Sequence, residues 1–238
     1  MTEGRGDLRE ETPWGELVLR IRPGPPPSAA LILEGLFLMD SESGVSEAAL
    51  AARGLGSLRQ ACPTGNNWRV LLGGLGLGLT LRRLLEEDRV GAVQVVELFA
   101  SLIDWNREAL GFLNGEGLND PRVTCHAGDL LAYLEQPPHD PFDLILLDID
   151  NGPTMLSLPS NAALYSSEGL EALRRRLAPR GIVVFWATER SMEFETELSG
   201  LSWAAWSREE IRWRSPRGDR ELSDELYFLT RRISGTGP

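Results

Sequence analysis

Residues 69–80 read RVLLGGLGLGLT, and residues 94–98 read QVVEL. The first segment is an apolar run that ends in four glycines, Gly73, Gly74, Gly76 and Gly78. A helix is predicted to begin at Leu79, and the second apolar run ends in the carboxylate of Glu97. Glycines let the backbone turn tightly beside a ligand, and an acid at the tip of the next strand can accept hydrogen bonds from ribose hydroxyls. The pattern favours a nucleotide-binding βαβ unit, and glycines that only pack a helix against a strand are the alternative.

The composition excludes several classes of chemistry. The chain has 238 residues, a formal net charge of −11 and no lysine, so that all 24 basic residues are arginine. The lack of a side-chain amine excludes Schiff-base chemistry and the phosphate-loop lysine. The acidic balance argues against a nucleic-acid partner. It is compatible with a cationic or neutral small-molecule substrate.

No signal for a membrane or a metal is visible in the sequence. No run approaches the ~20 apolar residues that span a bilayer, and the charged start MTEGRGDLREE does not resemble a signal peptide. We therefore expect a cytoplasmic protein, in which Cys62 and Cys125 stay reduced. Neither cysteine has metal-like spacing, and neither His126 nor His139 has a metal-binding companion, so no metal is predicted.

The chain divides into two predicted parts. Residues 1–66 form a β-rich leader, with short strands at Glu16–Arg22 and Ala29–Met39 around a proline-rich turn. A helix follows over Ser46–Gly54, with Ser43 or Ser46 as a possible cap. Residues 67–238 form the second part, in which strands and helices alternate.

This alternation predicts a parallel sheet covered by helices on both faces. Five strands are expected, at Val70–Gly73, Ala92–Glu97, Arg122–Cys125, Phe142–Leu147 and Ile182–Trp186. Four helices are expected, at Leu79–Asp88, Ser101–Leu113, Leu130–Glu135 and Ser167–Leu177. The end of the chain differs. Leu201–Trp213 and Glu225–Arg231 resemble an antiparallel hairpin with a turn near Arg217-Gly218, and we interpret Trp203, Trp206 and Trp213 as strand packing.

Polar residues cluster where the predicted strands end. In a parallel α/β sheet, ligands bind beyond the carboxyl ends of the strands. Asp129 follows the third strand and can receive an adenine amino group or cap the next helix. Asp148, Asp150 and Asn151 follow the fourth strand. A carboxylate at Asp148 can orient an amine nucleophile or accept its proton. The alternative for Asn151-Gly152-Pro153 is a turn that has no catalytic role.

Taken together, these segments resemble the class I S-adenosylmethionine-dependent methyltransferase fold, and within it the spermidine synthase-like branch. The resemblance covers about residues 15–232 and rests on VLLGGLGLGLTLRRLL, VVELFASLIDWNRE, RVTCHAGDLLAYL and FDLILLDIDNGP. It implies an α/β Rossmann-like sheet, whose parallel strands are closed by a C-terminal antiparallel hairpin, with a small β-rich N-terminal leader.

The resemblance also implies roles for single residues. The nucleoside co-substrate, S-adenosylmethionine or its decarboxylated form, would be bound by the glycine turn and three strand ends: Gly73, Gly74, Gly76, Gly78, Glu97, Leu98, Gly128, Asp129, Leu130 and Asp148. Asp148 would also be the catalytic acid, with Asp150 and Asn151 beside it. No metal is implied.

The chain departs from this branch in its acceptor site. Spermidine synthases carry an aspartate in the glycine loop, where this chain has Leu77. They line the polyamine pocket with a glutamine and an Asp-Glu pair, and the matching positions are Leu38, Ser43 and Gly44. Their catalytic loop is of the Asp-Ser-Ser-Asp type, and the matching residues of this chain are Asp148-Ile149-Asp150-Asn151. The resemblance thus extends to cofactor binding and does not extend to polyamine specificity.

Our leading hypothesis from the sequence is methyl transfer from S-adenosylmethionine to a small-molecule acceptor. Aminopropyl transfer from decarboxylated S-adenosylmethionine to a polyamine is the enzymatic alternative. An inactive nucleoside-binding module is a second class, and a NAD-dependent oxidoreductase is a weaker competitor. No nucleic-acid or membrane partner is expected, and a homodimer is left open.

Overall fold

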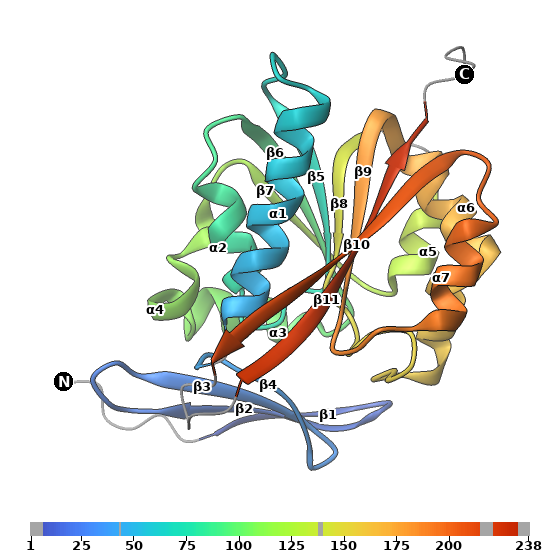
Figure 1. Cartoon of the computed structure of the whole chain (residues 1–238). Helices are drawn as coiled ribbons and strands as arrows, with labels where there is room; N and C mark the ends of the chain where they lie inside the picture. Colours follow the sequence, from blue (N-terminus) through green and yellow to red (C-terminus); the bar gives the residue numbers. More distant parts are fainter. Residues whose placement is uncertain (1–6, 43, 138–139, 215–220, 233–238) are drawn as a thin grey trace.

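The computed structural model of the chain describes residues 7–42, 44–137, 140–214 and 221–232. It contains two sheets, a four-stranded antiparallel sheet near the N-terminus and a seven-stranded mixed sheet (Figure 1). Ser43, His139 and the predicted turn at Arg217-Gly218 lie outside the described residues. Within the described part, no helix is both long and apolar enough to cross a bilayer.

The N-terminal sheet is a meander of four strands in chain order, β1 (Leu8–Thr12), β2 (Gly15–Arg22), β3 (Ser28–Leu33) and β4 (Leu36–Asp40). The sequence predicted β2 but missed β1, and it merged β3 and β4 into one strand over 29–39. The two strands separate at Glu34 and Gly35, whose φ angles are 48° and 75°. Positive φ at two consecutive residues is the geometry of a tight hairpin turn, which reverses the chain here.

Helix α1 (Val45–Ala61) is longer than the predicted helix, which ended at Gly54. Gly54 lies inside α1 because the helix packs there against the main sheet. A Cβ at this position would lie 2.8 Å from the Leu146 side chain. The N-cap residue is Gly44, and no side chain caps the helix, so Ser46 is not the cap.

The seven-stranded sheet has the order β10-β11-β9-β8-β5-β6-β7. Its strands are β5 (Trp68–Gly73), β6 (Val90–Glu97), β7 (Val123–Ala127), β8 (Phe142–Leu147), β9 (Leu177–Ala187), β10 (Ala204–Arg214) and β11 (Glu221–Arg231). The first five strands are parallel to one another, and β11 pairs antiparallel with both β9 and β10. This arrangement confirms the predicted architecture, five parallel strands closed by a C-terminal hairpin.

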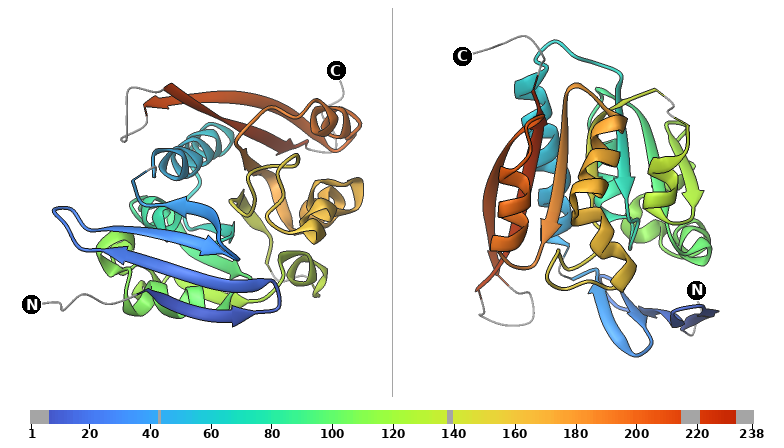
Figure 2. Two further views of the ribbon diagram at one scale, coloured as in Figure 1. Left: turned by 90° about the horizontal axis from the view of Figure 1, so that it is seen from below. Right: turned by 90° about the vertical axis from the view of Figure 1, so that its right-hand side faces the viewer.

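Helices cover both faces of this sheet (Figure 2). They are α2 (Leu79–Leu85), α3 (Ala100–Glu108), α4 (Gly111–Asn114), α5 (Leu130–Glu135), α6 (Ser167–Arg176) and α7 (Met192–Ser199), with 3₁₀ segments η1 (Gly117–Asn119) and η2 (Pro159–Tyr165). Successive strand residues enter opposite cores: Val70 and Leu72 pack with α1 and α2, whereas Leu71 packs with α5 and α6. Strands buried on both faces read as unbroken apolar runs. The sequence missed α7 and η2, and it merged α3 with α4.

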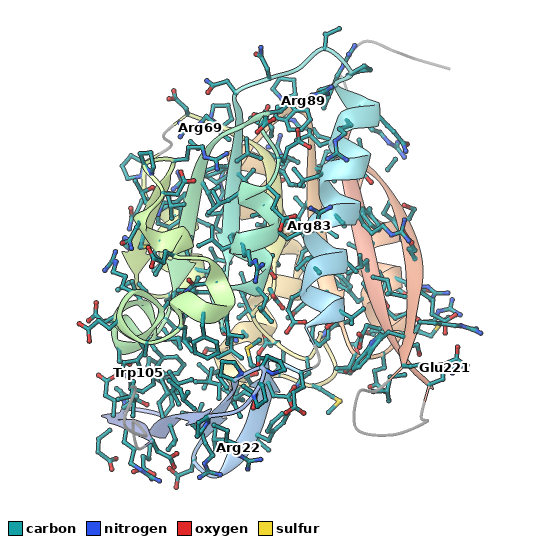
Figure 3. The ribbon with its side chains drawn as sticks, turned by 90° about the vertical axis from the view of Figure 1, so that its left-hand side faces the viewer. Arg22, Arg69, Arg83, Arg89, Trp105 and Glu221 are labelled. Carbon is teal, nitrogen blue, oxygen red and sulfur yellow. The ribbon has the colours of Figure 1, made fainter. Side chains whose placement is uncertain are left out.

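The N-terminal sheet lies across the carboxyl ends of the parallel strands (Figure 1). Its apolar face packs on α3 and the following segment, where Trp105 contacts two of the buried clusters. Figure 3 shows Trp105 beside this sheet, whereas Arg69 and Arg89 lie at the opposite edge of the main sheet. The carboxyl ends of the parallel strands therefore face the N-terminal sheet.

Candidate active site

A cavity of about 460 Å³ lies at the carboxyl edge of the parallel strands. Its wall contains most of the residues singled out in the sequence, namely Gly74, Gly76, Glu97, Leu98, Gly128, Asp129, Leu130, Asp148, Asp150 and Asn151. Gly73 and Gly78 are not part of the wall. The structure thus brings the glycine turn, the acid after β6 and the loop after β8 to one place.

The glycine turn approaches β8 closely enough to exclude side chains. Gly74 has φ of +84°, and a Cβ there would lie 2.1 Å from the carbonyl oxygen of Asp148. Gly73 accepts a hydrogen bond from the Asp148 N–H at 2.9 Å, so it joins the two strands behind the cavity. Gly78 is the N-cap residue of α2, with φ of 79°, and a Cβ there would clash with Asn106 and Asn114. Gly73 and Gly78 therefore support the conformation of the turn without lining the cavity.

Glu97 is the last residue of β6 and is only 5 % exposed. Its Oε2 accepts a hydrogen bond from the Leu75 N–H at 2.8 Å, and its Oε1 accepts one from the Phe99 N–H at 2.9 Å. Burial raises the pKa of Glu97, while these backbone N–H groups favour the charged form. The carboxylate is thereby fixed against the glycine turn.

Asp129 is the N-cap residue of α5, and its Oδ1 accepts a hydrogen bond from the Ala132 N–H at 2.8 Å. The capping role considered in the sequence is therefore present, and the residue also lines the cavity beside Gly128 and Leu130. A role in binding adenine stays a prediction.

Asp148 follows β8 directly and lines the cavity. Its Oδ2 accepts a hydrogen bond from the Thr80 hydroxyl at 2.9 Å. Removal from bulk water raises the pKa of Asp148 to about 6, and the nearby carboxylate of Asp224 acts in the same direction. A carboxylate that titrates near neutral pH can accept a proton from a bound amine.

Asp150 and Asn151 organise the loop after β8. Asp150 is 4 % exposed, and its Oδ1 accepts hydrogen bonds from the Ser157 N–H at 2.7 Å and the Asn161 side-chain amide at 2.9 Å. The carbonyl oxygen of Asn151 accepts from the N–H and the hydroxyl of Thr188. Both residues line the cavity. Their catalytic roles stay predictions, and the contacts show that they also hold the loop in place.

Three cavity carboxylates were not predicted from the sequence: Asp40 at the end of β4, Glu47 near the start of α1 and Asp224 in β11. Asp40 and Asp224 are each 5 % exposed, and Glu47 is 9 % exposed. Burial and the neighbouring charge of Asp148 raise the pKa of Glu47 to about 7. Burial also raises the pKa of Asp224. The position of Asp224 could have been inferred from the predicted hairpin. Because β11 runs antiparallel to β9, the first residues of β11 lie at the same edge of the sheet as the last residues of β9.

Trp213 has a different role from the one predicted. The sequence assigned it to strand packing, but it lines the cavity, and its indole N–H donates a hydrogen bond to Asp224 Oδ2 at 2.7 Å. The hairpin β10–β11 thus contributes a Trp–Asp pair to the site. Leu77, at the position where the resemblance implied an aspartate, is fully buried among Leu19, Ala29 and Leu110 and does not line the cavity.

The charge of the cavity has one sign. Seven carboxylates line it, those of Asp40, Glu47, Glu97, Asp129, Asp148, Asp150 and Asp224. Among the described residues of the wall there is no arginine and no histidine. The described part of the chain also contains no cluster of three or more His, Cys, Asp or Glu side chains arranged to hold a metal ion. This charge distribution favours a cationic ligand over an anionic one.

Comparison of the fold with solved structures gives the same architecture. Spermidine synthase from Thermotoga maritima matches with a TM-score of 0.67 and 17 % identity, covering 95 % of this chain and 73 % of the solved chain. A spermidine synthase in complex with the transition-state analogue AdoDATO matches with a TM-score of 0.66 and 17 % identity, over 95 % of this chain and 72 % of the other.

Comparison of the sequence gives relatives at higher identity over shorter spans. Polyamine aminopropyltransferase 2 of Pseudomonas aeruginosa is 35 % identical over 126 residues, which are 51 % of this chain and 34 % of the relative. Spermine synthase of Arabidopsis thaliana is 30 % identical over 139 residues, which are 58 % of this chain and 36 % of the relative. The chain thus matches about a third of the length of these curated relatives. Residues 55–201 match the spermine/spermidine synthase domain, and because this span is more than half of the chain, the protein belongs to the spermine/spermidine synthase domain family.

Proposed function

We propose that the protein is an aminopropyltransferase, which moves the aminopropyl group of decarboxylated S-adenosylmethionine to a cationic amine. The observation that carries this proposal is the cavity wall, with seven carboxylates and no basic side chain among its described residues. The sequence alone favoured methyl transfer. Family membership and the acidic cavity favour the alternative.

The two donors differ in one charge. S-Adenosylmethionine carries a carboxylate on its methionine part, and its decarboxylated form does not. A carboxylate placed near Asp148 and Glu47 would meet two like charges, and no cationic side chain among the described residues of the wall would balance them. At an effective dielectric constant of 20, two like charges 4 Å apart repel by about 4 kcal/mol. The positive charges of the decarboxylated donor, its sulfonium and its ammonium, are instead attracted by this wall.

We assign the nucleoside part of the donor to the part of the cavity that is lined by the ends of β6 and β7. We assign the ribose hydroxyls to Glu97 and the adenine edge to Asp129, Leu130 and the backbone at Gly128. The turn at Gly74 and Gly76 would let the backbone approach the sulfur-bearing chain without a side chain in between.

The reaction then needs a neutral amine beside the donor. The amine nitrogen attacks the carbon next to the sulfonium sulfur, a C–N bond forms, and the C–S bond breaks to release neutral methylthioadenosine. The attacking nitrogen loses one proton, for which Asp148 is the acceptor. The sulfonium is already activated, so most of the rate would come from holding nitrogen and carbon in line.

The direct test is product analysis by mass spectrometry. The protein is incubated with a linear diamine and either donor. We expect methylthioadenosine and an amine extended by one aminopropyl group from the decarboxylated donor. Methylated amine and S-adenosylhomocysteine from S-adenosylmethionine would instead support methyl transfer. No product from either donor, with nucleoside binding intact, would favour an inactive binding module.

A further inference from the structure

Three contacts that fix Asp148 come from one short segment of the chain, residues 73–80. The Asp148 N–H donates a hydrogen bond to the Gly73 carbonyl oxygen at 2.9 Å. The carbonyl oxygen of Asp148 lies against Gly74, where a Cβ would be 2.1 Å away. The Thr80 hydroxyl donates a hydrogen bond to Asp148 Oδ2 at 2.9 Å. Both the backbone and the side chain of Asp148 are therefore held by the segment that forms the glycine turn.

Thr80 is the second residue of α2 and is only 2 % exposed. A threonine hydroxyl in a helix can bond to the carbonyl oxygen one turn earlier, which here belongs to Gly76. That oxygen instead accepts a hydrogen bond from the side-chain amide of Asn106 at 2.9 Å, and the Thr80 hydroxyl reaches Asp148, 68 residues away in the sequence. Thr80 is not part of the cavity wall, so its effect on a ligand is exerted through Asp148.

The groups that surround Asp148 disfavour its charged form. Burial raises the pKa of Asp148 to about 6, and the carboxylate of Asp224 in β11 acts in the same direction. Asp148 in turn repels negative charge on Glu47 in α1 and on Tyr165 in η2. Among the described residues, the Thr80 hydroxyl is the one hydrogen-bond donor to this carboxylate, and it lowers the pKa. Thr80 thus opposes the burial and the neighbouring charge.

We propose that Thr80 is a positioning residue for the proton transfer: its hydroxyl holds the Asp148 carboxylate in the charged form that accepts the proton of the reacting amine. This role rests on the proposed aminopropyl transfer. A hydrogen bond donated to a carboxylate favours the charged form over the protonated one, and it is about twice as strong as a bond between neutral groups. In the reaction, the proton passes from the attacking nitrogen to Asp148, and Thr80 keeps its own proton.

The same hydrogen bond relates the proton acceptor to the bound donor. We assigned the turn at Gly74 and Gly76 to the sulfur-bearing chain of the donor, and α2 follows this turn directly. Asp148 is thus fixed to the segment that would hold the carbon under attack, and an in-line displacement depends on such fixed geometry.

The test is the pH dependence of kcat/KM for a linear diamine with the decarboxylated donor. Thr80→Val keeps the branched shape and removes the hydroxyl, so the acid limb of the profile should move up by about one to two pH units. The rate should fall by about two- to tenfold at pH 7 and recover near pH 9. Thr80→Ser restores the hydroxyl and should restore the profile. Thr196→Val removes an exposed helical hydroxyl that bonds to the Met192 carbonyl oxygen, outside the cavity wall, and should leave the profile unchanged.

A second measurement does not depend on turnover. Carbon-13 NMR follows the titration of the Asp148 carboxyl group, whose signal is identified by its absence from Asp148→Asn. The midpoint should rise in Thr80→Val, and in Thr80→Ala, which removes the hydroxyl without keeping the bulk. It should return toward the original value in Thr80→Ser. An unchanged circular dichroism spectrum and retained methylthioadenosine binding show that each variant is folded.

The outcomes separate the role of Thr80 from the reaction itself. An unchanged acid limb and an unchanged NMR midpoint in Thr80→Val and Thr80→Ala would overturn the proposal and keep aminopropyl transfer. A loss of rate that is equal at every pH would also overturn it, because a purely structural defect has that signature. A midpoint that rises as expected, in a protein that forms no aminopropyl product, would keep the effect of Thr80 on Asp148 and refute the transfer.

Discussion

Glu47→Gln should stabilise the protein at high pH, because burial and the neighbouring Asp148 disfavour the charged form of the Glu47 carboxylate. Burial beside Asp148 raises the pKa of Glu47 from 4.5 to about 7. The folded protein therefore binds more protons than the unfolded chain between these pH values, and this carboxyl group lowers the free energy of unfolding as the pH rises through them. Each tenfold change in proton affinity is worth 1.36 kcal/mol, so the charge on Glu47 costs up to about 3 kcal/mol above pH 7.

The substitution removes the charge and keeps the shape of the side chain. Glutamine can still accept the hydrogen bond from the Ser46 hydroxyl. In urea unfolding at pH 5, the variant and the unaltered protein should differ little, because Glu47 is mostly protonated there. At pH 8 the variant should be more stable by about 2–3 kcal/mol. Glu221→Gln, which removes an exposed carboxylate outside the cavity wall, should show no such pH-dependent gain. A Glu47→Gln variant that is equally or less stable than the unaltered protein at pH 8 would refute this reasoning.

Three further substitutions test the donor half of the cavity. Glu97→Ala should weaken methylthioadenosine binding by about 1–3 kcal/mol in calorimetry, since we assign the ribose hydroxyls to this buried carboxylate, and unchanged affinity would exclude Glu97 from the site. Asp148→Asn should lower turnover by about 10²–10⁴-fold while donor affinity changes little; equal losses in both would assign Asp148 to binding or folding. Gly74→Ala should lower the melting temperature more than Gly35→Ala. Both residues have positive φ, but only at Gly74 would a Cβ meet a carbonyl oxygen, at 2.1 Å, and equal effects would contradict the close approach.

The alternation of the main sheet could be read from the sequence because its strands are buried on both faces. Unbroken apolar runs such as Leu144–Leu147 need no partner to be recognised. The strands of the N-terminal leader were harder to predict from the sequence. β3 and β4 are both apolar, and the Glu34-Gly35 turn between them carries neither Asn nor Asp, so the segment was read as one strand.

The residues that we assign to the donor could be proposed from the sequence, since each lies at or just after the end of a strand. Glu47 and Asp224 could not be proposed, because tertiary packing places them. Glu47 enters the cavity only because α1 lies across β8 and β9, and its position resembles an ordinary acid in a helical first turn. Asp224 depends on the register of β11 against β9. Its partner Trp213 is eleven residues away across the hairpin, so no short motif joins them.

The dissociation constants of decarboxylated S-adenosylmethionine and S-adenosylmethionine, measured side by side by calorimetry, test the central claim most directly. An acidic cavity with no basic side chain among its described residues should bind the decarboxylated donor at least about tenfold more tightly, because the extra carboxylate meets only like charge there. Equal affinities, or tighter binding of S-adenosylmethionine, would contradict the account.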